Sequence, residues 1–288
     1  MNNSKIGYDA GEYGIIESIV ENFIVFFSLR SLCFEYIMRF LLYNIRYATG
    51  HKGRYHLPVP YAGFFKHTQD NLDQIIAFIQ TIDPDVIGLL EVDSGSYRSG
   101  KCCQAETIAE RLGYTHIVET KYADNSLACR VPVLRMQSNA LLTKEHVLHH
   151  SFHYFEEGIK RLVIQGELEK VVFFIVHLSL KYRHRQNQLE RLHHLVKNVA
   201  KPVIIGGDFN TFWGSRELEL FLAATGLQNA NIASIPSHPS HSPRRQIDFI
   251  LHSHELQVTN FQIPDIRLSD HAPLICDLSL IDSDSDSR

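Results

Sequence analysis

Short apolar runs that end in polar side chains recur along most of the chain. The clearest run covers residues 203–205 and leads into Gly-Gly-Asp-Phe-Asn at 206–210. It predicts a strand buried on both faces, whose glycines let another part of the chain approach the backbone closely. If the strand geometry continues, Asp208 and Asn210 lie two positions apart and point to one face. A carboxylate and an amide then meet at the carboxyl end of a buried strand, where open α/β sheets tend to bind ligands.

The same pattern predicts an α/β fold. Further strands are expected over residues 39–45, 86–90, 115–119, 139–142, 146–150, 160–167, 171–176, 247–251, 256–262 and 272–280. Apolar residues at helical spacing predict helices over residues 67–81, 104–112, 183–199 and near 215–224. No repeat and no linker interrupts residues 39–280. Helices mixed with more than eight strands predict two packed sheets covered by helices on both sides.

The two ends of the chain depart from this pattern. Residues 15–42 are apolar overall, but charged residues interrupt them, and the longest uninterrupted run is far shorter than the roughly 20 residues of a membrane span. The segment also lacks the basic start and the cleavage site of a signal peptide. We expect residues 1–37 to be an N-terminal extension outside the core and residues 38–280 to form one domain. Residues 281–288 alternate serine with aspartate and are expected to be a disordered acidic tail.

Composition narrows the class of protein. A hydrophobic fraction of 44% and a charged fraction of 21% are ordinary for a soluble globular chain. The net charge of −4 argues against a global basic field for nucleic acid, although a local basic groove is compatible with it. The five cysteines are odd in number and include the adjacent pair Cys102 and Cys103. They favour a reduced, cytoplasmic protein over a disulfide scaffold, and we expect a monomer.

Polar groups stand at the ends of the predicted strands in a defined order. They are Asn44, Glu91, His177, Asp208 with Asn210, Asp248, and Asp270 with His271. Taken singly, each has a plainer interpretation as a turn residue, a strand cap or a surface group, and the chain has 17 histidines. Taken together, their repeated position at strand ends favours a single site.

With Gly-Asp-Phe-Asn at 207–210 and Ser-Asp-His-Ala-Pro-Leu at 269–274, the ordered set resembles the endonuclease/exonuclease/phosphatase superfamily over residues 38–280. This superfamily includes deoxyribonuclease-I-like nucleases, neutral sphingomyelinases and inositol polyphosphate phosphatases. The resemblance implies a four-layer α/β sandwich, in which two packed mixed β-sheets are flanked by helices. It also implies an enzyme that hydrolyses phosphoester bonds with the help of a divalent metal ion.

The resemblance assigns a metal site to three of the residues. Glu91 is the expected main ligand of Mg²⁺ or Mn²⁺, and Asp270 is the expected second ligand. Asn44 would hydrogen-bond in the first metal shell. Oxygen ligands suit a hard cation, which would neutralise the phosphate and the leaving oxygen during hydrolysis.

The other residues receive catalytic roles. Asp208 would hold or deprotonate the attacking water, and Asn210 would orient that water and the phosphate. His177 and His271 would donate hydrogen bonds to phosphate oxygens as charge builds there. Asp248 would pair with His271, fix its tautomer and raise its pKa.

The substrate stays open at this point. A phosphodiesterase of the endonuclease type is the first hypothesis, and the basic runs at 181–185 and 244–245 would then rim the site. A phosphatase or a sphingomyelinase-like hydrolase of a small or lipid phosphoester is the alternative, with the aromatic loop at 55–65 as a lipid contact. A non-catalytic binding module fits less well, because the catalytic residues are all present. Arg161 and Tyr154 are the mid-chain candidates for a phosphate contact.

Overall fold

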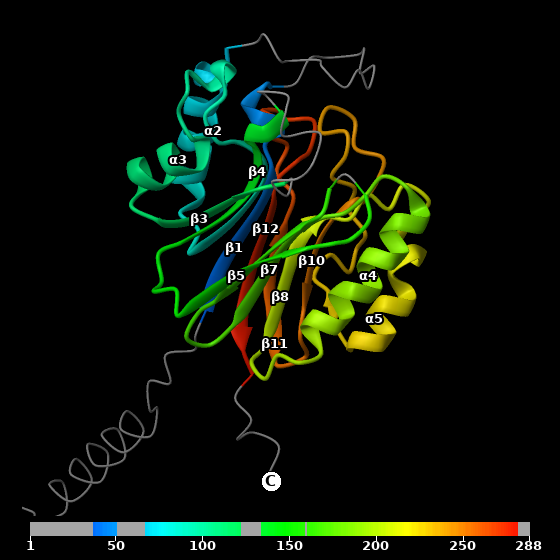
Figure 1. Ribbon diagram of the computed structural model, residues 1–288. Helices are drawn as coiled ribbons and strands as arrows, with labels where there is room; N and C mark the ends of the chain where they lie inside the picture. Colours follow the sequence, from blue (N-terminus) through cyan, green and yellow to red (C-terminus); the bar gives the residue numbers. More distant parts are fainter. Residues whose placement is uncertain (1–36, 51–66, 122–133, 159, 282–288) are drawn as a thin grey trace, which may run out of the picture. The chain divides into compact units, whose positions relative to one another are not determined.

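The structure is a computed structural model, which describes residues 37–50, 67–121, 134–158 and 160–281 (Figure 1). The expected N-terminal extension, the aromatic loop at 55–65 and the acidic tail lie outside the described residues, apart from Ile37 and Ile281. Twelve strands form two sheets of six strands each among the described residues.

The first sheet has the strand order β11-β12-β1-β2-β4-β3. Its members are β1 (Ile37–Asn44), β2 (Val86–Asp93), β3 (Thr115–Thr120), β4 (Gln137–Thr143), β11 (Leu256–Gln262) and β12 (Leu274–Leu280). β1 and β2 are parallel, and the remaining pairs are antiparallel. The central strands are buried along nearly their whole length, which explains why they read as continuous apolar runs.

The second sheet has the order β5-β6-β7-β8-β10-β9. Its members are β5 (His149–Tyr154), β6 (Leu162–Glu167), β7 (Val172–His177), β8 (Val203–Asp208), β9 (Gln228–Asn229) and β10 (Asp248–His252). Only β7 and β8 are parallel among these strands. The expected strand at 146–150 is wrong in its bounds, because β5 is an edge strand of exposed and half-buried residues without the apolar run that would mark where it lies.

Helices cover the outer faces of both sheets (Figure 1). α2 (Gln69–Ile82) and α3 (Gln104–Leu112) share an apolar cluster with the first sheet. α4 (Tyr182–Val196) and α5 (Glu219–Thr225) share another with the second sheet. The short 3-10 helices are η1 (Arg46–Ala48), η2 (Tyr97–Ser99), η4 (Leu134–Met136) and η5 (Ser215–Leu218). The predicted four-layer α/β sandwich is therefore confirmed.

The two sheets approach each other closely at glycines. The ring centroids of Phe40 and Phe173, one from each sheet, lie 5.0 Å apart. A Cβ atom on Gly88 would lie 2.8 Å from a side-chain atom of Ile175, and one on Gly206 would lie 2.7 Å from the Phe40 ring. The close approach expected at Gly206 is thus made by the opposite sheet. No helix within the described ranges is long and apolar enough to cross a membrane.

Candidate active site

The predicted polar residues of the first sheet reach one end of that sheet. Asn44 closes β1, and Glu91 lies near the end of the parallel strand β2. Asp270 and His271 precede β12, which runs antiparallel to β1. The carboxyl end of a strand and the amino end of its antiparallel neighbour share an edge, so residues distant in sequence meet there.

The second sheet contributes its residues in the same way. His177 closes β7 and Asp208 closes β8, and the two residues are paired in the parallel register. Asp248 opens the antiparallel strand β10 directly opposite Asp208. Asp208 therefore lies between a histidine and a second carboxylate.

A cavity of about 810 Å³ opens at this end of the molecule. The predicted residues that line it are Glu91, Asp208, Asn210, Asp270 and His271. The other three lie behind them in direct contact, because Asn44 Nδ2 donates to Asp208 Oδ2 at 3.4 Å and His177 Nε2 lies 3.0 Å from that oxygen. Asp248 Oδ2 lies 2.8 Å from His271 Nδ1. The eight residues thus form one connected group.

Two of these residues adopt left-handed backbone conformations. Glu91 has a φ of 54° at a register shift between β2 and β4, so a bulge redirects its side chain. Asn210 has a φ of 52°, and its backbone N–H donates to Asp208 Oδ1 at 3.0 Å. The expectation that Asp208 and Asn210 share a strand face is wrong, because the strand ends at Asp208. Backbone strain of this kind tends to occur at functional sites.

Asp208 is an ionised carboxylate in a buried position. Burial by itself would raise the pKa of Asp208, but His177, His271 and Lys160 outweigh it and hold the pKa well below its usual range. Burial and Lys160 lower the pKa of His177 to about 4, so this ring is neutral at pH 7. Asp208 is therefore a hydrogen-bond acceptor at all working pH values, and a weak base.

Asp248 and His271 form the pair expected from the sequence. Asp248 accepts hydrogen bonds from His271 Nδ1 at 2.8 Å and from Ser237 Oγ at 2.5 Å. Burial would lower the pKa of His271, but Asp248 and, to a smaller extent, Asp208 and Asp270 raise it to about 10. His271 is therefore an imidazolium with its Nε2 toward the cavity side of Asp208, 3.9 Å from Oδ2.

Two lysines that sequence reasoning missed flank Glu91. The Glu91 Oε1 atom lies 3.7 Å from Lys160 Nζ and 4.0 Å from Lys121 Nζ. Burial would raise the pKa of Glu91, but the two lysines and His177 lower it to about 2. Lys160 also contacts His177 Nε2. Its neighbour Arg161 donates instead to the exposed Glu156 carbonyl, so Lys160 is the mid-chain basic group at the site.

A chain of contacts with three other side chains holds Lys121 in place. Its Nζ donates to the hydroxyl of Tyr47 at 3.3 Å, and the Arg98 guanidinium stacks on the Tyr47 ring at 4.1 Å. Arg98 in turn pairs with the buried Asp93 at 2.5 Å. Burial lowers the pKa of Lys121 to about 7, with Lys160 adding to the effect and Glu91 opposing it. Lys121 directly follows β3, but a single lysine at a strand end gave no sequence signal for this role.

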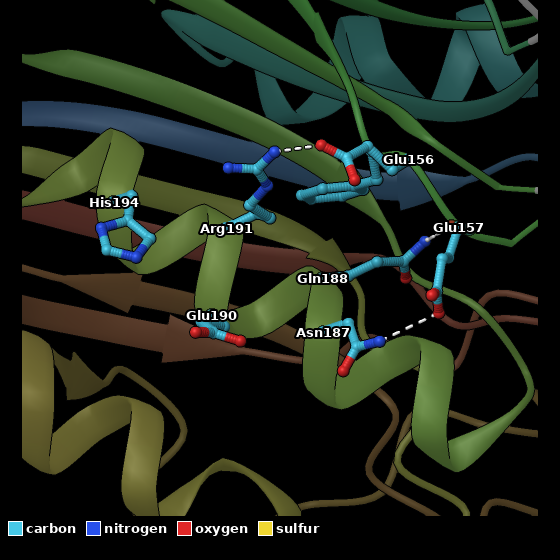
Figure 2. A pocket seen from close by; sticks show the side chains of 8 residues that line it. Glu156, Glu157, Asn187, Gln188, Glu190, Arg191 and His194 are labelled. Atoms are coloured by element: carbon cyan, nitrogen blue, oxygen red, sulfur yellow. Dashed lines mark hydrogen bonds and ion pairs between the residues drawn. The ribbon is translucent and has the colours of Figure 1, made fainter.

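The cavity wall carries further positive charge. Arg46, Arg244 and Arg245 line it, and Arg46 pairs with Asp270 at 3.4 Å. A second cavity of about 360 Å³, between α4 and the segment after β5, is lined by Glu156, Glu157 and Glu190 among others (Figure 2). Arg191 also lines the second cavity, where it pairs with Glu156. The basic cavity brings its arginines together with the strand-end residues, so it is the candidate phosphoester site.

The donor set of the basic cavity fits a hard divalent cation. Among the described residues, none comes within hydrogen-bond distance of the Glu91 carboxylate, whose nearest cationic atom lies 3.7 Å away. Its oxygens are therefore open to an ion. Asp208 and Asp270 add carboxylates to the same cavity, and Mg²⁺ binds such oxygens with waters completing its shell.

Comparison with known proteins gives a family match. A sequence model described as the Endonuclease/Exonuclease/phosphatase family matches residues 42–271. No curated protein sequence matches the chain.

Several solved structures share the fold. An endonuclease/exonuclease/phosphatase family protein from Bacteroides thetaiotaomicron is 14% identical, with a TM-score of 0.66 over 86% of this chain and 99% of that chain. A mannosyl-6-phosphatase from the same organism is 15% identical, with a TM-score of 0.64 over 84% and 100% of the two chains. ANGEL2, a 2′,3′-cyclic phosphatase, is 16% identical, with a TM-score of 0.60 over 86% and 97%. At these identities the likeness concerns the fold.

Proposed function

Since the chain belongs to the endonuclease/exonuclease/phosphatase family, we propose that it is a divalent-metal-dependent phosphodiesterase that cleaves nucleic acid. Members of this family hydrolyse phosphoesters, so the chain is an enzyme of that class. The proposal concerns the finer assignment, namely the diester substrate, the metal ion and the roles of the residues.

One observation carries the choice of a diester. On a chain with a net charge of −4, the cavity wall gathers Arg46, Arg244 and Arg245 around the candidate catalytic group. Charges on the wall lie beside the reacting phosphate, where a nucleic-acid strand carries its neighbouring phosphates. A substrate with a single phosphate would not need positive charge on this part of the wall.

The residues of the cavity divide the chemistry among them. Mg²⁺ or Mn²⁺, when held by Glu91 and Asp270 with Asn44 beside them, would neutralise charge on the phosphate. Asp208 accepts a hydrogen bond from the attacking water and, because its pKa is low, orients this water more than it deprotonates it. Asn210, whose amide donates to the Leu178 carbonyl at 2.9 Å, is fixed next to that water.

The cationic side chains act on the phosphate itself. His271 donates from Nε2 to a phosphate oxygen, and this hydrogen bond strengthens as negative charge accumulates in the transition state. Lys160 adds positive charge from the Glu91 side, and Lys121, whose pKa burial lowers to about 7, adds to it as the pH falls below 7. His177, neutral and in contact with Asp208 and Lys160, keeps these two groups in position.

A phosphatase acting on a small phosphoester is the second candidate. Two lysines beside the reacting phosphate suit a phosphomonoester dianion, which carries more charge than a diester. The fold neighbours named mannosyl-6-phosphatase and 2′,3′-cyclic phosphatase support this candidate. The sphingomyelinase-like alternative depends on the loop at 55–65, which lies outside the described residues.

The test is a substrate screen with purified protein and Mg²⁺ or Mn²⁺. Single-stranded DNA, RNA, sphingomyelin and sugar phosphates are offered in parallel, with EDTA and the His271→Ala variant as blanks. We expect metal-dependent cleavage of an oligonucleotide that both blanks abolish. Release of inorganic phosphate from monoesters, with oligonucleotides left intact, would replace the first candidate by the second.

A further inference from the structure

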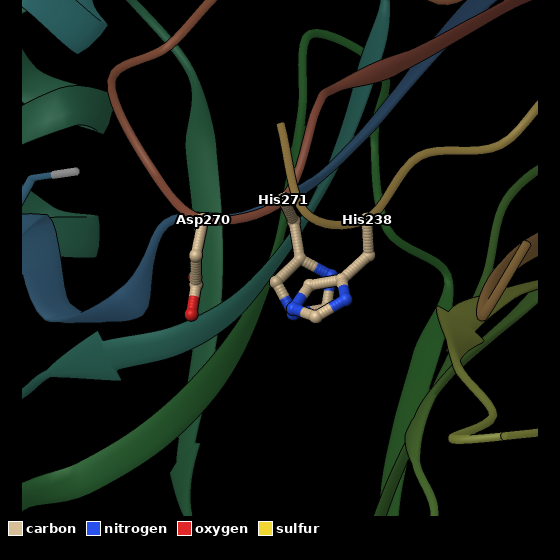
Figure 3. A group of neighbouring side chains, drawn as sticks. All are labelled: His238, Asp270 and His271. Atoms are coloured by element: carbon tan, nitrogen blue, oxygen red, sulfur yellow. The ribbon is translucent and has the colours of Figure 1, made fainter. Parts of the chain in front are cut away.

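A second group of possible metal ligands lies on the wall of the same cavity (Figure 3). His238 comes from the segment before β10, and Asp270 and His271 come from the segment before β12. One ligand atom from each residue lies within 4.8 Å of the other two. Two imidazoles with one carboxylate make a donor set that transition metals favour, whereas Mg²⁺ prefers oxygen alone.

The ring geometry suits a shared ion. The centroids of the His238 and His271 rings lie 4.8 Å apart, with 51° between the ring planes. Two imidazoles that bind one ion at about 2.1 Å, with about 90–109° between the bonds, place their centroids about 4.5–5.2 Å apart. The observed separation falls in that interval, so the two rings need little movement to share an ion.

The hydrogen bonds of the two histidine rings also bear on metal binding. His271 uses Nδ1 for Asp248 at 2.8 Å, and its Nε2 lies 3.5 Å from Asn44 Nδ2, which would have to turn away to let this nitrogen bind an ion. This carboxylate–histidine–metal arrangement is the usual support of a histidine ligand. His238 Nδ1 is buried and has no hydrogen-bond partner within the part of the chain that the structure describes. The other ring nitrogen of His238, Nε2, lies on the Asp270 side in Figure 3 and would be the ligand atom.

We propose that His238, Asp270 and His271 bind one transition-metal ion, separate from the ion at Glu91. The inference deepens the proposed function, since it gives the same cavity a second cation. It moves Asp270, which the proposed function gives to the ion at Glu91, to the second ion, so that Glu91 with Asn44 holds the first. Asp208, Asp248 and Asp270 surround His271 and attract a divalent cation, while Arg46, 3.4 Å from Asp270, opposes it.

An ion held there would take the place of the proton on His271 Nε2 and would supply positive charge for a phosphate oxygen. Metal binding at histidine releases protons, so the affinity should rise with pH. The ion-free protein keeps the imidazolium. The site therefore has two forms, one with a proton on His271 Nε2 and one with the metal ion on that nitrogen.

The test measures binding of Co²⁺ through its visible absorption, in an excess of Mg²⁺ that occupies the oxygen site. The full chain is compared with His238→Ala and Glu91→Gln, and with His241→Ala as a control histidine that lines the cavity outside the cluster. We expect His238→Ala to weaken Co²⁺ binding by at least about 10-fold, since even indirect support of a metal ligand contributes 10–100-fold. His241→Ala and Glu91→Gln should keep the absorption.

Equal Co²⁺ affinity in His238→Ala and the unaltered chain would overturn the proposal, as would loss of the Co²⁺ signal in Glu91→Gln alone. Thermal unfolding in EDTA checks that each variant folds. His238→Asn is the second variant, because it keeps a polar side chain and lacks the imidazole ligand. Co²⁺ binding is measured without substrate. A failed substrate screen would therefore contradict only the proposed function, and a failed Co²⁺ titration would contradict only the second metal site.

Discussion

Replacing Asp248 by asparagine removes the group that keeps His271 charged. A pKa of about 10 against an ordinary value of 6.5 corresponds to roughly 5 kcal/mol in favour of the imidazolium. Asp248 raises the pKa of His271 more than any other group, so its loss should lower this pKa well below 10 even though Asp208 and Asp270 remain. The ring of the variant would then lose its charge at a lower pH, whereas in the unaltered protein it stays charged up to about pH 10.

The assay is kcat/KM against pH with Mg²⁺ as the sole divalent ion. The unaltered enzyme should show no loss from His271 until the pH nears 10. Asp248→Asn should lose activity at a distinctly lower pH than the unaltered enzyme, because the charged donor disappears earlier as the pH rises. His271→Ala should be slow at every pH, by roughly 10²–10³, the effect of removing one hydrogen-bond donor to the developing charge.

A double variant completes the test. Since Asp248 acts through His271, the combination of Asp248→Asn with His271→Ala should be little slower than His271→Ala alone. Fully additive losses, or an Asp248→Asn profile that runs parallel to that of the unaltered enzyme, would show that the two residues act separately. Circular dichroism of each variant excludes a loss of fold as the cause.

Other parts of the site give further predictions. Glu91→Gln should lower kcat by about 10²-fold or more and weaken the Mg²⁺ dependence; full activity in excess EDTA would contradict its role as a ligand. Lys121→Met should lower activity and raise stability, because burial lowers the pKa of this lysine from 10.5 to about 7 and so penalises its charged form. The gain in the free energy of unfolding, at most about 5 kcal/mol, should be complete below pH 7 and vanish as the pH rises to 10.5. Thermal unfolding in EDTA at several pH values would measure it. Replacing Arg244 and Arg245 together by alanine should raise KM for an oligonucleotide about 10-fold at constant kcat and reduce the salt slope by about 2; an unchanged slope would place the strand elsewhere.

Sequence reasoning identified most of the architecture because buried strands carry a strong signal. The bounds predicted for α3 and β11 agree with the structure, and the strands that hold Asn44, His177 and Asp208 end at those residues. Each of these strands is an apolar run that ends at a polar group, so the hydrophobic pattern alone marks its end.

The rest of the site depends on tertiary contacts that no local pattern encodes. Lys121 and Lys160 reach Glu91 from separate parts of the chain, and His238 reaches His271 from a segment outside the named strands. The bulge at Glu91 arises from pairing with β4, about 48 residues away, through a hydrogen bond from the Glu91 N–H to Asn139. Such residues become visible only when the two sheets are packed together.

The division of the site between the two sheets has a consequence for inactivation. Asn44 and Glu91 belong to one layer and His177, Asp208 and Asp248 to the other, and glycines set the spacing between the layers. Neither sheet alone carries the complete set of site residues. A slight sliding of one layer over the other would leave every strand ladder intact and still separate water from phosphate. The catalytic rate therefore depends on how the two sheets are positioned relative to each other. On heating, activity should be lost before the far-ultraviolet circular dichroism spectrum changes.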